Sequence, residues 1–283
     1  AEKLKIIGRA GVGVDNIDIQ AATEKGIIVI NSPDGNTIAA TEHTFAMMLA
    51  VSRNIPQANA TMHNGQWDRK KYVGVELRNK TLGVIGLGRI GAGVAKRAQS
   101  FEMKVIAYDP FVSADRAESL GVKLVQLDEL FKTADFITVH MPLTKKTENM
   151  ISLAEMKMMK PTVRLINCAR GGIINEADLA VALQEKIIAG AAIDVFTSEP
   201  LENSPLQNLP NIILTPHLGA STVEAQIGVS VDVAHGIIDA LSDKPVASAV
   251  NMPHIPSHIL KKVTPYLDLA ERLGRTITAL SKT

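Results

Sequence analysis

Short apolar runs rich in β-branched residues alternate with helical patterns through the middle of this 283-residue chain. Several of these runs are apolar on both sides of the strand alternation, which is typical of a parallel sheet covered on both faces. Repeated β-then-α order with short connections predicts an α/β fold with a doubly wound parallel sheet. The predicted strands are Thr81–Ile85, Val105–Tyr108, Phe136–His140, Arg164–Asn167, Ala191–Val195 and Ile212–Thr215. The predicted helices between them are Ile90–Ser100, Leu153–Met159 and Glu176–Gln184.

Two longer helices are predicted on either side of this block. The first runs from Ile38 to about Met62, and Pro56 is expected to kink or interrupt it. The second begins at the sequence Ser221-Thr-Val-Glu224, which matches a capping box. Apolar residues then recur at helical spacing and predict one apolar face for this helix. That face consists of Ile227, Val231, Ala234, Ile238 and Leu241.

Composition excludes several classes of function. Thirty Lys and Arg residues against 29 Asp and Glu residues leave a net charge of +1. Nucleic acids and anionic membranes are usually bound by clustered positive charge, so neither is expected as a partner. The apolar run Phe45–Val51 is far shorter than the roughly 20 residues of a membrane span, and no secretory signal peptide is expected. The single cysteine, Cys168, forms no internal disulfide, which favours the reducing cytoplasm.

The glycine-rich sequence GLGRIG, at Gly86–Gly91, directly follows a predicted strand and opens a predicted helix. The next predicted strand leads into Asp109, eighteen residues after Gly91. This combination is typical of a dinucleotide-binding site, in which Gly86 permits a tight turn, Gly88 admits the pyrophosphate and Gly91 allows close packing. The phosphates would lie at the helix N-terminus. Because Pro110 and Phe111 carry no positive charge, NAD is favoured over NADP.

Three chemically complementary side chains follow three different predicted strands. Arg170 can bind a carboxylate and polarise an adjacent carbonyl group. His217 can exchange a proton near neutral pH, and Glu199 can hold the imidazole and favour imidazolium. The carboxyl ends of parallel strands meet at one edge of a sheet, where ligands bind in α/β proteins. Beside a nicotinamide, this set suits interconversion of a 2-hydroxy acid and a 2-oxo acid, with no metal required.

These motifs closely resemble the D-2-hydroxyacid dehydrogenase family, and the resemblance extends nearly from end to end. It is carried by GRAGVGVDNID at Gly8–Asp18, NSPDGN at Asn31–Asn36, GLGRIG, YDP at Tyr108–Pro110, NCARGG at Asn167–Gly172, DVFTSEP at Asp194–Pro200 and PHLGAST at Pro216–Thr222. The resemblance implies that residues 35–220 form an NAD-binding Rossmann domain. It also implies that residues 1–34 and 221–283 form a discontinuous substrate-binding lobe. Because the family's lobe starts before the equivalent of Ala1, that lobe is expected to lack its N-terminal part.

The resemblance also assigns roles to individual residues. Arg170 binds the substrate, His217 is the acid/base and Glu199 supports His217. Arg89 and Ile90 contact the cofactor phosphates, and Asp109 contacts the ribose. Further cofactor contacts are implied for Val12, Met141, Cys168, Ala169, Arg170, Asp194, His217, Leu218, Gly219 and Ala220. Further substrate contacts are implied for Arg9, Asn36 and Arg69. Val12 and Met141 replace the threonines that many close members carry, which removes two side-chain hydroxyl contacts.

The sequence around Arg69, WDRKK at Trp67–Lys71, resembles the members that oxidise D-3-phosphoglycerate. The implied reaction is the NAD-dependent oxidation of D-3-phosphoglycerate to 3-phosphohydroxypyruvate, the first step of phosphorylated L-serine biosynthesis. Reduction of hydroxypyruvate, glyoxylate or 2-oxoglutarate is the alternative within the family, and a dinucleotide-responsive binding protein is the alternative outside catalysis. The family resemblance further implies a homodimer or homotetramer. In this segment, NAD binding is expected to survive while turnover is poor.

Overall fold

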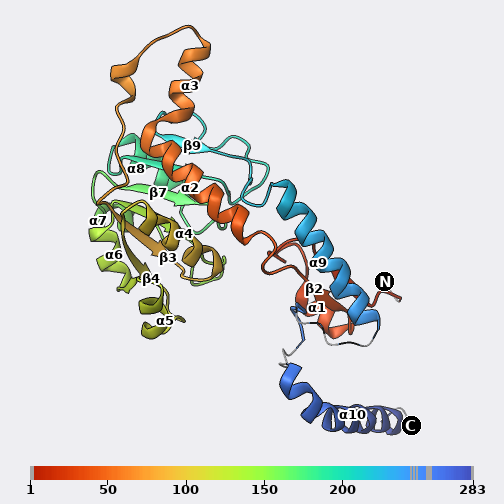
Figure 1. Cartoon of the computed structure of the whole chain (residues 1–283). Helices are drawn as coiled ribbons and strands as arrows, with labels where there is room; N and C mark the ends of the chain where they lie inside the picture. Colours follow the sequence, from red (N-terminus) through yellow and green to blue (C-terminus); the bar gives the residue numbers. More distant parts are fainter. Residues whose placement is uncertain (1–2, 243, 245, 247, 253–256, 282–283) are drawn as a thin grey trace. The chain divides into compact units, whose positions relative to one another are not determined.

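The computed structural model describes residues 3–242, 244, 246, 248–252 and 257–281 (Figure 1). Contacts within the chain divide it into two compact units. The smaller unit comprises residues 1–35 and 226–283, and the larger unit comprises residues 36–225. Within the described ranges, every helix is either too short or too polar to cross a membrane.

The larger unit contains a seven-stranded sheet in which every strand is parallel to its neighbours. The strands are β3 (Thr81–Ile85), β4 (Lys104–Tyr108), β5 (Lys123–Leu124), β6 (Phe136–Val139), β7 (Arg164–Asn167), β8 (Gly190–Ile193) and β9 (Ile212–Leu214). Their order is β5-β4-β3-β6-β7-β8-β9, so the chain builds outward from β3 in one direction and then from β6 in the other. The predicted doubly wound parallel sheet is confirmed. β3 and β7 have the predicted bounds, and the other predicted strands differ at one or both ends.

Helices cover both faces of this sheet (Figure 1). On one face, α2 (Thr37–Arg53) packs on β7, β8 and β9 and against α4 (Arg89–Ser100). On the other face lie α6 (Leu127–Thr133), α7 (Leu153–Met158) and α8 (Glu176–Gln184). Successive residues of a strand point to opposite faces, and β7 accordingly places Leu165 in one apolar cluster and Ile166 in the other. Both faces of the sheet are therefore buried.

The predicted break in the first long helix lies at Asn54, two residues before Pro56. Asn54 has the left-handed φ of 54°, and α3 (Ile55–His63) starts directly after it with Pro56 in its first turn. Proline is tolerated in a first helical turn but not in a helix interior, so the preceding helix must end before it. The side-chain amide of Gln57 in α3 donates hydrogen bonds to the carbonyl groups of Pro210 (3.1 Å) and Ile212 (3.4 Å), along the last strand of the sheet.

The smaller unit contains two parallel strands, β1 (Ile6–Gly8) and β2 (Ile28–Ile30). The chain between them forms α1 (Ile19–Glu24), whose N-terminus is capped by Asp18. The later residues of α9 (Val223–Leu241) and helix α10 (Ser257–Leu280) complete this unit. The helix α5 (Ala114–Ser119) and the short 3-10 helix η1 (Arg69–Tyr72) belong to the larger unit.

The apolar residues predicted to share one face of α9 do lie on one face of a continuous helix, but that face is exposed in the described chain. Ile227, Val231, Ile238 and Leu241 are 47–62% exposed, whereas Val229 and Val233 are 6–7% exposed. Glycines explain the difference, because a Cβ on Gly8 would lie 2.5 Å from Val233 and a Cβ on Gly35 would lie 2.5 Å from Val229. The helix therefore packs through the face that glycine allows to approach most closely, and a count of large apolar residues does not detect this.

The predicted capping box at the start of α9 is also displaced. The amide of Ala225 donates to the Thr222 hydroxyl (3.1 Å), so Thr222 caps the first turn. Ser221 instead closes a turn, because its amide donates to the carbonyl group of Leu218 (2.8 Å). The preceding loop thus fixes Ser221, and the helix starts later than the sequence pattern indicates.

Candidate active site

The loop between β3 and α4 has the backbone geometry that the glycines predict. Gly86 has a φ of +95°, and a Cβ there would lie 2.6 Å from the carbonyl oxygen of His140. A Cβ on Gly91 would lie 2.0 Å from the carbonyl oxygen of Gly86. A Cβ on Gly88 would meet no protein atom within 4 Å, so this position is open. Gly86 and Gly91 are thus required by the fold, while Gly88 leaves space for a ligand.

This open position lies at the start of α4. Gly88 is the N-cap residue of α4 and has no side chain that could cap the first turn. That turn begins with Arg89 and Ile90. Amide groups at a helix N-terminus and the helix dipole favour a bound phosphate. The Asp109 carboxylate accepts hydrogen bonds from the amides of Leu87 (2.8 Å) and Phe111 (2.8 Å), which places it against the same loop. These residues fit the pyrophosphate and ribose of a dinucleotide.

Met141 packs against this loop, because its Cγ atom would lie 2.8 Å from a Cβ on Gly86. Met141 therefore borders the glycine loop at the end of β6, next to the point where the strand order reverses. This is the position at which doubly wound sheets bind their ligands.

The loops after β7, β8 and β9 pack against one another at the same edge of the sheet. A Cβ on Gly171 would lie 1.9 Å from the carbonyl oxygen of Phe196, so the first two loops are in direct contact. A Cβ on Gly219 would lie 3.8 Å from the carbonyl oxygen of Cys168, which joins the third loop to the first. The structure thus brings together the segments that carry Arg170, Glu199 and His217.

His217 and Glu199 form a hydrogen-bonded pair. The His217 Nδ1 atom lies 2.7 Å from Glu199 Oε2, and the two side chains are 47% and 37% exposed. The second oxygen of Glu199 accepts a hydrogen bond from the amide of Phe196 (3.0 Å), which fixes the carboxylate. A carboxylate on Nδ1 requires the proton there and leaves Nε2 of a neutral imidazole as the base.

The Arg170 loop is shaped by Asn167, the last residue of β7. The Asn167 side chain donates to the carbonyl group of Arg170 (2.9 Å) and accepts from the amide of Ala169 (3.0 Å). The Arg170 guanidinium is half-buried and donates to the carbonyl group of Ala169 (2.7 Å). Two side-chain hydrogen bonds therefore hold the turn from which Arg170 projects.

Asp194 is fully buried and binds the loop that carries His217. Its carboxylate accepts hydrogen bonds from the Thr215 hydroxyl (2.5 Å) and from the amides of Leu218 (2.8 Å) and Gly219 (2.9 Å). His43 Nε2 lies 3.1 Å from the same carboxylate. Burial by itself raises the pKa of Asp194, but the hydrogen bonds from His43, Thr215 and Leu218 outweigh burial and lower the pKa overall. The role of Asp194 toward the cofactor stays a prediction.

His43, Cys168 and Asp194 also place one potential metal-ligating atom each within 4.8 Å of one another. Burial, followed by the charge of Asp194, raises the pKa of the Cys168 thiol to about 12, so the thiol is protonated at neutral pH. The Asp194 carboxylate is already surrounded by hydroxyl and amide donors. A thiolate and an available carboxylate are what a metal requires, so this cluster is better described as a hydrogen-bonded network.

Other predicted contact residues lie outside this group of loops. Arg9 and Val12 belong to the smaller unit, where the carbonyl group of Val12 accepts from the Asn31 side chain (2.7 Å). Asn36 precedes α2, and its buried Oδ1 atom has no hydrogen-bond partner within the described chain. Arg69 lies in η1, on an exposed segment after α3 that projects from the sheet (Figure 1). The substrate roles of these residues stay predictions.

Sequence analysis missed several residues that hold these loops. His43 and Thr215 contact Asp194, and Glu176 accepts hydrogen bonds from the amide (2.6 Å) and hydroxyl (2.8 Å) of Thr197. A signal for His43 was present, because it lies one helical turn before the buried Met47 and is itself partly buried. A polar side chain in such a position needs a hydrogen-bond partner.

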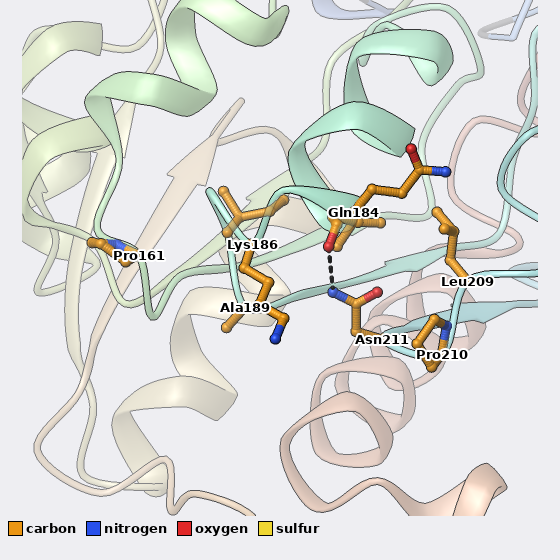
Figure 2. A pocket seen from close by; sticks show the side chains of 9 residues that line it. Pro161, Gln184, Lys186, Ala189, Leu209, Pro210 and Asn211 are labelled. Carbon is orange, nitrogen blue, oxygen red and sulfur yellow. Dashed lines mark hydrogen bonds between the residues drawn. The ribbon is translucent and has the colours of Figure 1, made fainter.

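A separate pocket of about 410 Å³ lies at the opposite edge of the sheet (Figure 2). Pro161, Ala189 and Asn211 in its lining precede β7, β8 and β9, respectively. The side chain of Asn211 donates to the carbonyl group of Leu183 (3.2 Å) and closes one wall. Lys186 is the only ionisable side chain among the residues that line this pocket. This pocket lies away from the carboxyl ends of the strands and is not the candidate active site.

Comparison with known proteins identifies the family of the larger unit. Residues 45–219 match the NAD-binding domain of the D-isomer specific 2-hydroxyacid dehydrogenases. The chain belongs to the D-isomer specific 2-hydroxyacid dehydrogenase family, and its larger unit contains the family's NAD-binding domain.

Individual relatives narrow the comparison. The chain is 55% identical to a D-3-phosphoglycerate dehydrogenase of Synechocystis sp., over 99% of this chain and 50% of the relative. It is 49% identical to D-3-phosphoglycerate dehydrogenase of Bacillus subtilis, over 99% of this chain and 53% of the relative. The chain thus spans about half the length of the curated relatives it matches.

Solved structures share the fold. The TT0316 protein from Thermus thermophilus superposes with a TM-score of 0.83 at 33% identity, covering 88% of this chain and 80% of that protein. D-Lactate dehydrogenase from Aquifex aeolicus, complexed with NAD and lactic acid, superposes with a TM-score of 0.77 at 32% identity. The matched regions are 89% of this chain and 81% of that protein.

Proposed function

We propose that this chain carries the active site of an NAD-dependent D-2-hydroxyacid dehydrogenase that oxidises D-3-phosphoglycerate to 3-phosphohydroxypyruvate, the first step of phosphorylated L-serine biosynthesis. The observation that carries the proposal is the 2.7 Å contact between His217 Nδ1 and Glu199 Oε2, on loops packed against the Arg170 loop. The choice of substrate is supported by relatives named D-3-phosphoglycerate dehydrogenase at 47–55% identity. Action in the cytoplasm as a homodimer or homotetramer stays a prediction.

Three side chains of this site have separate tasks. The Gly86–Gly91 loop and Asp109 would hold NAD, which would supply the hydride acceptor for C2 of the hydroxy acid. Arg170 binds the substrate carboxylate and neutralises charge beside the reacting carbon. His217 Nε2 takes the proton of the C2 hydroxyl group, and the Glu199 carboxylate on Nδ1 stabilises the resulting imidazolium. The Cys168 thiol, with its pKa of about 12, remains protonated and takes no part as a nucleophile.

The proposal is tested by steady-state oxidation of D-3-phosphoglycerate with NAD, followed by NADH absorbance. Substitution of His217 by Asn removes the base, so kcat is expected to fall about 100- to 10,000-fold. NADH binding, measured by fluorescence, is expected to change less than about twofold, because the glycine loop is unchanged. Turnover that survives His217→Asn undiminished would contradict the catalytic assignment.

A substrate panel with NADH separates the alternatives within the family. Reduction of 3-phosphohydroxypyruvate with the highest kcat/KM is expected. Preference for hydroxypyruvate, glyoxylate or 2-oxoglutarate would replace the proposed substrate and leave the mechanism intact. A full-length wild-type protein that binds NADH and turns over none of these compounds would instead favour a dinucleotide-responsive binding protein.

A further inference from the structure

We infer that His43 is a positioning residue for His217, and that it acts through the buried carboxylate of Asp194. Its importance for catalysis rests on the proposed function, whereas its effect on the position of the loop does not. Neither residue needs to touch the reacting atoms for this role.

The first step is the attachment of the His217 loop to Asp194. The backbone carbonyl group of Asp194 accepts a hydrogen bond from the His217 amide (2.9 Å), and its carboxylate accepts from Leu218 and Gly219. The Thr215 hydroxyl donates to the same carboxylate from the other side of His217. The residues that precede and follow His217 in the sequence are thus hydrogen-bonded to one residue, Asp194, at the end of β8.

This attachment is needed because His217 has an unfavourable backbone conformation. Its φ is +54°, in the left-handed region that residues with a Cβ rarely adopt. Such a conformation is unfavourable and persists only when the surrounding structure enforces it. The hydrogen bonds from Thr215, Leu218 and Gly219 to Asp194 supply that constraint.

The second step is the connection of Asp194 to the core through His43. His43 Nε2 lies 3.1 Å from Asp194 Oδ1 and 3.3 Å from the Thr215 hydroxyl, and its side chain is 18% exposed. His43 comes from α2, which buries Phe45 and Met48 in the core between the sheet and α4. His43 therefore donates from a firmly packed helix to the carboxylate that holds the loop.

Loss of the His43 donor is expected to change the position of His217. A buried carboxylate that loses one charge-compensating donor is stabilised less well, and it then holds its other donors in a less defined position. The catalytic base must lie close to its productive position, since a displacement of about 1 Å can cost roughly 100-fold in rate.

The experiment compares His43→Leu, His43→Gln and the control His63→Leu. Leucine removes the donor, glutamine retains an N–H donor, and His63 is exposed at the end of α3. Amide hydrogen exchange of Thr215 and residues 217–220 is measured first because it does not depend on activity. In His43→Leu, exchange at Leu218 and Gly219 is expected to rise about tenfold, equivalent to ~1.4 kcal/mol. In His63→Leu and His43→Gln it is expected to stay near the wild-type rate.

Kinetics provide the second measurement. His43→Leu is expected to lower kcat about 10- to 100-fold with KM for NAD changed less than about twofold, and His43→Gln to restore most of the loss. Unchanged exchange at Leu218 and Gly219 in His43→Leu, or exchange raised equally throughout residues 36–225, overturns the inference. If the full-length wild-type protein lacks dehydrogenase activity but His43→Leu raises exchange at these two amides alone, the proposed function fails and the inference about the loop stands.

Discussion

Asp135 shows how one side chain can hold several strands of the sheet. Asp135 directly precedes β6. Its carboxylate accepts hydrogen bonds from the Thr81 amide (2.8 Å) and from Lys160 Nζ (2.9 Å). Its backbone carbonyl group accepts a hydrogen bond from the Arg164 amide (3.1 Å). Thr81 starts β3 and Arg164 starts β7. The N-terminal ends of three adjacent strands therefore depend on this residue, at the edge opposite the candidate active site.

The Asp135 carboxylate is expected to make stability depend on pH. Burial by itself raises its pKa, but hydrogen bonds from Thr81 and Lys160 and the charge of Lys160 lower it overall. The folded protein then binds fewer protons than the unfolded chain, so this contribution is full above the ordinary pKa and is lost as pH falls through the lower folded value. Asp135→Asn is expected to lose about 1–2 kcal/mol at neutral pH.

Urea unfolding at about pH 7, 5 and 3.5, followed by circular dichroism, tests this expectation. The difference between wild type and Asp135→Asn should shrink only in the most acidic samples. Glu118→Gln, on the exposed surface of α5, serves as the control and should show little change at neutral pH. A difference that grows toward acid pH would contradict the assigned sign.

At the scale of elements, the connection between β3 and α4 separates residues required for folding from residues required for binding. Gly91 faces the carbonyl oxygen of Gly86 at a distance that excludes any side chain. Gly88 faces open space and has a backbone conformation that alanine can adopt. Gly88 and Gly91 lie three residues apart in one motif, but Gly88 leaves space for a ligand whereas Gly91 permits close backbone packing.

The matched pair Gly88→Ala and Gly91→Ala tests this difference. Gly88→Ala is expected to unfold near the wild-type urea midpoint but to bind NADH at least about tenfold more weakly, because its methyl group occupies the space open to the phosphates. Gly91→Ala is expected to lose about 1–3 kcal/mol of stability as well, because α4 must move away from the loop. Equal stability of the two variants would contradict the assignment, as would unchanged NADH affinity in Gly88→Ala.

Sequence patterns located most elements of the larger unit because each has a strong local signal. Buried strands such as Thr81–Ile85 are short apolar runs, and α8 starts and ends at the predicted residues. Which face of α9 is buried could not be predicted, because close packing at Gly8 and Gly35 decides it and the sequence does not reveal such tertiary contacts. His43 was missed for a similar reason, since its partner Asp194 lies 151 residues away in the sequence.

For the whole molecule, the two units differ in how much core each contains. The described part of the smaller unit has an apolar cluster formed by Ala22, Ile27 and Val29, with partly buried residues around it. The larger unit has extensive clusters on both faces of its sheet. Because buried apolar area supplies most of the stabilising free energy, the smaller unit is expected to unfold first.

Two separate transitions are therefore expected in urea, and NADH should shift only the second. A ligand stabilises the unit that binds it by RT ln(1 + [L]/Kd), or about 2.7 kcal/mol at 100 times Kd. Hydrogen exchange at increasing urea identifies which residues open in each transition, and residues 36–225 should open last. A single transition that NADH shifts as a whole would show that the two units unfold together.

The hydrogen bonds from Gln57 along β9 affect whether copies of this protein aggregate through their sheet edges at high concentration. An outer strand with unpaired backbone groups is a template on which another chain can add a strand and begin to aggregate. Gln57 already engages the carbonyl groups of Pro210 and Ile212. At the other border, β5 is only two residues long and begins with the exposed Lys123. Both outer strands of the sheet are thus protected against edge-to-edge aggregation. At β9, the Gln57 side chain binds backbone carbonyl groups that an added strand would otherwise use. At β5, the short length of the strand and the charge of Lys123 have the same effect.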